Sequence, residues 1–196
     1  IKWGISSSLM NSFTGAVSEA YGYVKNLDKS LNDIRIVGGK SAKEMEQFAI
    51  HANKAAQALG SNTLDYTNAS LIYYQQGLGD EQVKQMTDIT VKMSNVLGAS
   101  AEEVSNYMTA IWNNFNDGSK SLEYYADVLT ALGAATASSA EEISTGLEKF
   151  AAVADATGLS YEYATAALTT VTAKTRQSAE VAGTAFKTLF ARIQDL

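Results

Sequence analysis

The chain contains no proline in 196 residues, although average usage would supply about ten. Proline interrupts helices, because it lacks a backbone N–H and its ring clashes with the preceding turn. Its absence therefore favours long, unbroken helices. Alanine, the strongest helix former, occurs 30 times. Much of the apolar content is therefore small, and we expect cores that contain few large side chains.

Apolar residues recur every three or four positions along most of the chain, which is the spacing of one face of a helix. The pattern is clear over residues 9–34, 45–59 and 143–154. No segment shows the strict alternation that is typical of a strand. We therefore predict an all-α protein of about nine helices, each about 14 to 28 residues long.

Serines at the expected helix starts provide independent signals. In a Ser-x-x-Glu capping box, the serine hydroxyl and the glutamate carboxylate each accept a hydrogen bond from a backbone N–H that would otherwise be unpaired. Serine also caps a helix without the glutamate. The predicted helix-cap residues are Ser41 with Glu44, Ser100 with Glu103, Ser139 with Glu142, and Ser160 and Ser178.

These start signals recur at a fixed interval. The interval from Ser100 to Ser139 equals the interval from Ser139 to Ser178, and Ser121 and Ser160 are separated by the same interval. Such a period is typical of stacked helical hairpins. An alanine-rich chain also begins helices with these residues by chance. The sequence therefore leaves two arrangements open, which are helical hairpins with a 39-residue repeat and a compact irregular helical bundle.

The expected loops are short, and the glycine pair within residues 37–40 is the clearest break. We therefore predict a long N-terminal helix over residues 1–37 and a helical-hairpin array over residues 40–196. The last residues continue a helical pattern without a cap or tail, so we expect the array to be truncated at its C-terminus.

The net charge is −6, with about +2 over residues 1–64, −10 over 65–162 and +2 over 163–196. This balance gives the chain no electrostatic preference for nucleic acid, so we predict no specific nucleic-acid partner. Four basic residues near the end lack interleaved stacking aromatics, and we interpret them as a solvated face. They are Lys174, Arg176, Lys187 and Arg192. No apolar run reaches the length of a membrane span.

Catalytic chemistry has few candidate residues. The chain has no cysteine and a single histidine, His51, with no acidic residue at helical spacing from it. The adjacent pairs Glu102/Glu103 and Glu141/Glu142 point in different directions on a helix, so they cannot flank one glycosidic bond as a cell-wall hydrolase requires. We predict that the chain is not an enzyme and has no catalytic residue, no cofactor and no metal site.

Aromatic residues recur once per helix or hairpin, and their spread is wider than one helical stripe. They either fill gaps between helices whose other contacts are small, or form a face that binds a protein partner. On the second interpretation the chain is a helical-repeat adaptor. The candidate partner face consists of Tyr73, Tyr74, Trp112, Tyr124 and Tyr125.

Several long runs of the chain resemble, in order, the core region of bacteriophage tail tape measure proteins of the TP901 type. The similarity extends from about Leu27 to the end, and no single short motif carries it. The runs are Leu71–Leu78, Ala110–Phe115, Ala131–Ile143, Gly146–Ala154, Gly158–Ala164 and Thr184–Ile193.

The resemblance implies a fragment of a structural virion protein of a phage or prophage. Tape measure proteins are long and largely helical, set the length of the tail tube and leave ahead of the DNA during ejection. The implied partners are the tail tube, a tail assembly chaperone and baseplate or tail-tip proteins, with self-association left open and membrane contact restricted to ejection. The implied locations are the tail lumen and, during assembly, the host cytoplasm.

Overall fold

The structure is a computed structural model that describes residues 17–136 and 138–194. Within these ranges all regular secondary structure is helical, with nine helices of 13 to 21 residues and no strand, which confirms the all-α prediction. The helices are α2 (Val17–Val37), α3 (Ala42–Ala58), α4 (Thr63–Gln75), α5 (Asp80–Leu97), α6 (Ala101–Phe115), α7 (Leu122–Ala135), α8 (Ala140–Ala156), α9 (Tyr161–Thr175) and α10 (Ala179–Gln194).

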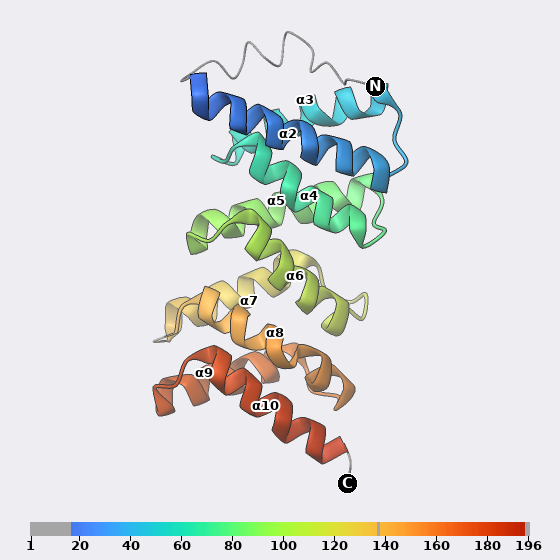
Figure 1. The fold of residues 1–196 in the computed structure, drawn as a ribbon. Coiled ribbons are helices and arrows are strands. Elements are labelled where there is room, and N and C mark those ends of the chain that lie inside the picture. Colours follow the sequence, from blue (N-terminus) through green and yellow to red (C-terminus); the bar gives the residue numbers. More distant parts are fainter. Residues whose placement is uncertain (1–16, 137, 195–196) are drawn as a thin grey trace. The chain divides into compact units, whose positions relative to one another are not determined.

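The helices belong to two compact units. The first unit contains the described residues up to Asn95 together with Ser100–Ser105, and the second contains Val96–Ala99 and the described residues from Asn106 onward. Helix α6 therefore contributes its first residues to one unit and the rest to the other (Figure 1). Helix α2 ends at Val37, and it packs against α3 and α4 of the first unit. The start of the predicted N-terminal helix, residues 1–16, lies outside the described residues.

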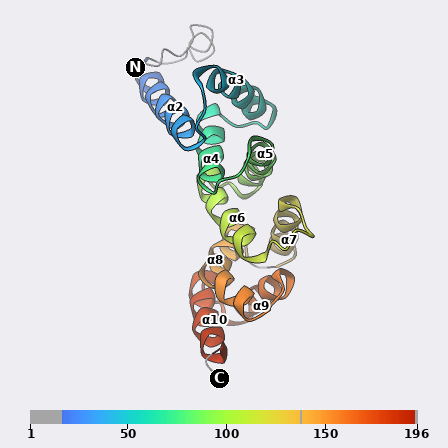
Figure 2. The ribbon, with the colours of Figure 1, turned by 90° about the vertical axis from the view of Figure 1, so that its right-hand side faces the viewer.

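In the first unit, α2 and α4 form one layer, and α3 and α5 form a second (Figure 2). The core between them combines alanine and tyrosine side chains with larger aliphatic ones, such as Leu27, Ile34 and Met45. Small residues allow the helix backbones to approach, and the aromatic rings fill the remaining space. One buried cluster contains Ala52, Ala56, Tyr66, Ala69, Val91 and Ala101.

Hydrogen bonds between buried polar side chains join α4 to α5. The Tyr66 hydroxyl donates to the Asp88 carboxylate at 2.8 Å. Two further hydroxyl pairs lie along the same two helices, Ser70 with Thr87 at 3.1 Å and Tyr73 with Thr90 at 2.5 Å. Because buried polar groups are costly unless they are paired, these bonds fix the register of α4 against α5.

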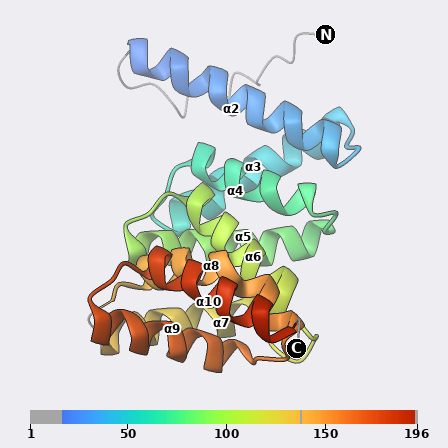
Figure 3. The ribbon, with the colours of Figure 1, turned by 60° about the horizontal axis from the view of Figure 1, so that its bottom comes forward.

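In the second unit, α8 and α10 lie side by side, and both pack against α9 (Figure 3). Their backbones meet at glycines. A Cβ atom added to Gly183 would lie 2.1 Å from the Gly146 carbonyl oxygen, and one added to Gly146 would lie 2.5 Å from the Ala179 carbonyl oxygen. No L side chain fits at these distances, so only glycine permits this crossing.

An aromatic group lies beside the glycine crossing. The ring centres of Phe150 and Phe186 are 5.2 Å apart, and Phe186 and Phe190 stack at 5.6 Å. Phe150 is buried, and Phe186 and Phe190 are half-buried. These rings supply the large apolar contact that the glycines cannot make.

The helix starts follow the spacing of the serine signals. Helices α6, α8 and α10 begin at equal intervals, at Ala101, Ala140 and Ala179. The same interval separates the start of α7 at Leu122 from the start of α9 at Tyr161. Equal spacing of starts does not by itself make the packed hairpins equivalent. The 39-residue repeat of packed hairpins therefore stays a prediction.

Candidate interaction sites

The predicted cap residues lie at helix starts and make the following bonds. Ser41 and Ser139 each form both halves of a capping box, with Glu44 and Glu142 respectively. The Ser41 hydroxyl accepts from the Glu44 N–H at 3.3 Å, and the Ser41 N–H donates to the Glu44 carboxylate at 2.8 Å. The Ser41 hydroxyl also donates to the Glu44 carboxylate at 2.6 Å. This bond, followed by the bond from the Ser41 N–H, holds the pKa of Glu44 below its usual range, because both stabilise the charged form.

The Ser100 hydroxyl accepts from the Glu103 N–H at 3.2 Å, and the Ser100 N–H donates to the Glu103 carboxylate at 3.0 Å. Ser160 accepts from the Tyr163 N–H at 3.2 Å, and Ser178 accepts from the Val181 N–H at 3.3 Å. All of these bonds lie within one turn of a helix. They position the helices and leave no group directed at a ligand.

Asn62 and Ser121 also cap helices. The serine spacing marks Ser121 as a helix start, whereas Asn62 is not among the residues that the sequence singles out. Asn62 accepts from the Asp65 N–H at 2.9 Å, and Ser121 accepts from the Tyr124 N–H at 3.3 Å. The signal that could have identified Asn62 is its position directly before the α4 apolar pattern, with Asp65 three residues later.

The five candidate partner-face aromatics are divided between the two units and are mostly buried within them. Tyr73, Tyr74 and Tyr125 are buried, with 1%, 6% and 1% of their surface exposed. Trp112 and Tyr124 are half-buried. Buried rings cannot contact a partner while the helices stay packed. This is a correction to the adaptor interpretation, since three of its residues fill the space between helices whose other contacts are small.

Each unit also contains a lysine held against a tyrosine ring and a carboxylate. In the first unit, the Lys40 Nζ lies 5.1 Å from the Tyr74 ring centre and pairs with Asp80, which also accepts from the Tyr74 hydroxyl at 3.1 Å. The bond from Lys40 holds the pKa of Asp80 below its usual range, because the ammonium favours the charged carboxylate. We call this group the first lysine clamp.

The second lysine clamp consists of Lys120, Tyr124 and Glu162. The Lys120 Nζ lies 3.8 Å from the Tyr124 ring centre and 3.5 Å from the Glu162 carboxylate, which accepts from the Tyr124 hydroxyl at 2.6 Å. The tyrosine bond is the main cause that lowers the pKa of Glu162. Each clamp joins a loop to the start of a helix about forty residues later, so both tie together elements that are distant in sequence.

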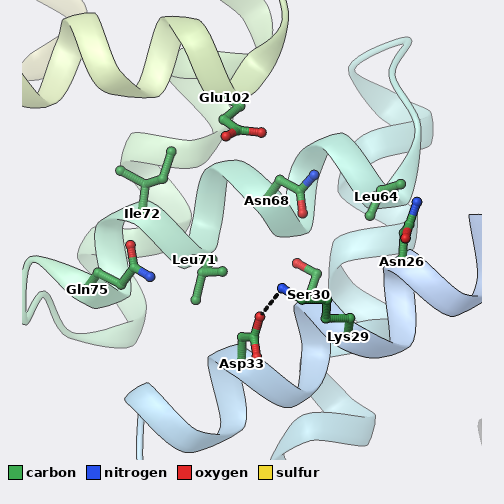
Figure 4. Close-up of a pocket in the computed structure, with 10 residues that line it drawn as sticks. All are labelled: Asn26, Lys29, Ser30, Asp33, Leu64, Asn68, Leu71, Ile72, Gln75 and Glu102. Atoms are coloured by element: carbon green, nitrogen blue, oxygen red, sulfur yellow. Dashed lines mark hydrogen bonds and ion pairs between the residues drawn. The ribbon is translucent and has the colours of Figure 1, made fainter.

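A groove of about 380 Å³ lies between α2 and α4 in the first unit. Four residues of α2, five of α4 and Glu102 of the first turn of α6 line it (Figure 4). Lys29 and Asp33 form an ion pair of 2.9 Å across one turn of α2. Ser30 is buried and directs its hydroxyl toward the space beneath Asn68 (Figure 4).

No role was predicted from the sequence for the residues that line this groove. Their side chains carry no motif, because α2 and α4 contribute them from positions about forty residues apart. The only local signal is the polar spacing of Asn26, Ser30 and Asp33 on one face of α2, which a solvated helix face also shows.

Other sites of chemistry are few in the part of the chain that the structure describes. Within it, no three His, Cys, Asp or Glu side chains are placed to hold a metal ion. None of the described helices is both long and apolar enough to cross a membrane. His51 lies edge-on to the Tyr66 ring at 6.3 Å, and its buried Nε2 bonds to no described residue.

Comparison with known families identifies the chain. The family described as phage-related minor tail protein matches residues 52–196, which is most of the sequence and includes parts of both units. No significant match was found among curated proteins or solved structures. The match covers well over half of the residues, and an all-α structural component of a phage tail agrees with the observed fold. The chain therefore belongs to the phage-related minor tail protein family.

Proposed function

We propose that this chain is a segment of a tail tape measure protein, a structural scaffold whose length sets the length of the tail tube and which is released during DNA ejection. The observation that carries the proposal is the family match over residues 52–196. The ordered runs that resemble TP901-type tape measure proteins all lie within the same range. We propose no enzymatic activity for the chain.

The architecture supports a scaffold whose helices are defined locally. Capping boxes at Ser41, Ser100 and Ser139 specify where helices begin without help from other helices. Helices of this kind can persist when their packing against neighbours changes, since the cap bonds stay within one turn. A protein that enters and later leaves a narrow tube benefits from that property.

The proposed partners are those of a tape measure. They are the tail tube that surrounds it, an assembly chaperone that holds it before tube formation, and baseplate or tail-tip proteins at its end, with self-association as a further arrangement. The proposed locations are the tail lumen and, before assembly, the host cytoplasm.

The test is to change the length of this region in the phage that encodes it. Deleting residues 140–178 removes one 39-residue interval, from the start of α8 to the residue before α10. If the region is an extended helix in the tail, the tail shortens by about 60 Å, at about 1.5 Å per residue. If the hairpins stay folded, the shortening is only about 10 Å, one interhelix spacing, because α8 and α10 are direct neighbours. Electron microscopy of purified tails measures the difference.

The matched control keeps the length and changes the sequence. Replacing residues 140–178 by a second copy of residues 101–139 leaves the chain length and the capping signals unchanged. Tails of this variant should have the wild-type length. Normal-length tails from the deletion phage would show that this region does not contribute to setting the tail length.

A further inference from the structure

The groove between α2 and α4 contains hydrogen-bonding side chains that the rest of the described chain leaves unpaired. Ser30 is only 4% exposed, and its Oγ has no hydrogen-bond partner among the described residues. Asn26, Asn68 and Gln75 also line the groove, and their side-chain amides bond to no other described residue. The one ion pair in the groove, Lys29 with Asp33, is already complete.

The unpaired Ser30 hydroxyl is the informative member of this set. Buried polar groups almost always have a partner, because leaving one unpaired forfeits its hydration without compensation. An exposed amide can bond to water, but Ser30 lies at the floor of the groove, where α2 faces α4 (Figure 4). A group that fills the groove would pair with the three amides directly, and would reach this hydroxyl, which has less than 1 Å² exposed, once the Ser30 side chain rotates toward the groove.

The side chains that line the groove indicate which class of ligand would fill it. Side-chain amides offer one acceptor and two donors, which matches the alternating N–H and C=O groups of a peptide backbone. Leu64, Leu71 and Ile72 of α4 add apolar contact for side chains. No aromatic ring is among the described residues that line the groove, so it lacks the stacking platform on which sugars and bases lie.

The charge of the groove narrows the class of ligand further. With Lys29 and Asp33 paired, the remaining charge in the groove is the carboxylate of Glu102, at the start of α6. A negative groove repels phosphate backbones and favours a neutral or basic ligand. The volume of about 380 Å³ is at the lower end of the range for small-ligand pockets, which is enough for a few residues of peptide.

We propose that the groove between α2 and α4 binds a short, extended, neutral or basic peptide segment of a protein partner. Asn26, Asn68 and Gln75 pair with its backbone, and Ser30 supplies a hydroxyl at the floor. Glu102 receives a basic side chain or an N–H group. The proposal does not depend on the tape measure role, because it rests on the first unit alone.

The experiment uses the 196-residue chain and an array of acetylated, amidated random hexapeptides. The peptides retained most strongly are then titrated in solution by fluorescence anisotropy. Asn68→Leu combined with Gln75→Leu should weaken binding at least tenfold, because two bidentate amides are lost. The control is Gln57→Leu, which replaces an exposed amide of α3 in the same unit, outside the groove. It should change the affinity less than twofold.

Ser30→Ala separates binding from stability. Removing an unpaired buried hydroxyl should leave the melting temperature of the free chain unchanged or raise it. The same substitution should weaken binding of the selected peptide severalfold. A purely structural serine would not produce this pair of effects. If the leucine variants lose helical circular dichroism, side-chain amide shifts of Asn68 and Gln75 in the wild-type chain provide the second measurement on addition of peptide.

Any one of three results would overturn the proposal. The first is that the array retains no peptide, and the second is that the selected peptides bind the Asn68→Leu/Gln75→Leu variant as tightly as the wild type. The third is that the amide signals of Asn68 and Gln75 do not shift when peptide is added. Saturable binding of a chito-oligosaccharide or an oligonucleotide that shifts these same signals would assign the groove to another class of ligand and would also reject it.

Discussion

The two units join their helices by different means. In the first unit, α4 meets α5 through hydrogen bonds between buried side chains, such as Tyr73 with Thr90 and Ser70 with Thr87. In the second unit, α8 meets α10 backbone to backbone at Gly146 and Gly183. The first contact tolerates changes in shape as long as the polar groups stay paired. The second tolerates almost no added atom, since the contact is steric.

This difference shows two solutions to one problem of composition. A chain with many alanines buries little apolar area per helix, so packing alone specifies register weakly. In the first unit, directional hydrogen bonds between hydroxyl groups specify how the helices align. In the second unit, the close backbone contact at the glycine crossing does so. Substitutions in the two units should therefore lower stability for different reasons, steric in the second unit and polar in the first. Four predictions test this.

The largest effect is expected at the glycine crossing. Gly183→Ala places a Cβ atom 2.1 Å from the Gly146 carbonyl oxygen, so α10 must move away from α8. We expect a loss of about 3 kcal/mol or more in the free energy of unfolding of the second unit, the upper range for overpacking. Urea denaturation followed by circular dichroism measures it.

Gly22→Ala is the matched control for this substitution, because a Cβ atom at Gly22 in the interior of α2 meets nothing within 4 Å. It should stabilise the chain by up to about 1 kcal/mol through helix propensity. Equal effects of the two substitutions would show that the crossing is not tight.

The next effect is expected at the buried hydroxyl pair of the first unit. Tyr73→Phe removes the partner of the Thr90 hydroxyl, which is fully buried. We expect a loss of about 1–2 kcal/mol in unfolding free energy, typical of an unpaired buried group. Burial raises the pKa of Tyr73 to about 12, so it is neutral at physiological pH and able to donate. Tyr163→Phe, at a ring that is 61% exposed, should leave stability unchanged.

The helix caps should respond equally in both units. Ser41→Ala and Ser139→Ala each remove the hydroxyl of a complete capping box, and each should lower the unfolding free energy by about 1 kcal/mol. Thermal melting of the two variants beside the wild type tests this. A loss at Ser41 with none at Ser139 would show that the caps depend on tertiary context, against the local account given above.

The smallest effect is expected from the lysine clamps and depends on pH. The folded-state pKa values of Asp80 and Glu162 are lowered, so their stabilisation is present above their unfolded pKa values, about 4, and is lost as pH falls through the folded values. Because Asp80 is 68% exposed and screened by water, we expect its ion pair to contribute at most about 0.5 kcal/mol.

The pH prediction is tested with Lys40→Met in the first unit and Tyr124→Phe in the second, because these two side chains are the main causes of the lowered pKa values of Asp80 and Glu162. Each substitution should flatten part of the decrease in melting temperature between pH 6 and pH 3. An unchanged pH profile in both variants would mean that other carboxylates control the acid response.

The capping boxes illustrate what could be read from the sequence, because Ser139 and Glu142 are three residues apart and their bonds close within one turn. The groove illustrates the opposite case. Asn68 and Ser30 are ordinary polar residues on separate helices, and only the packing of α2 against α4 gives them a common space. The aromatic residues lie between these cases, since their spacing indicated a role but not whether Tyr73 and Tyr125 are buried.

By itself, the sequence determined the helical class and the places where helices begin, because proline exclusion, apolar periodicity and serine caps act over three or four residues. The tertiary structure alone decided which faces meet. Gly146 and Gly183 touch, and Lys40 reaches Asp80, through contacts between residues nearly forty positions apart. Such contacts depend on the fit of whole helices, and alanine-rich stripes permit several fits of similar energy. For that reason the partner of each face could not be read from local spacing.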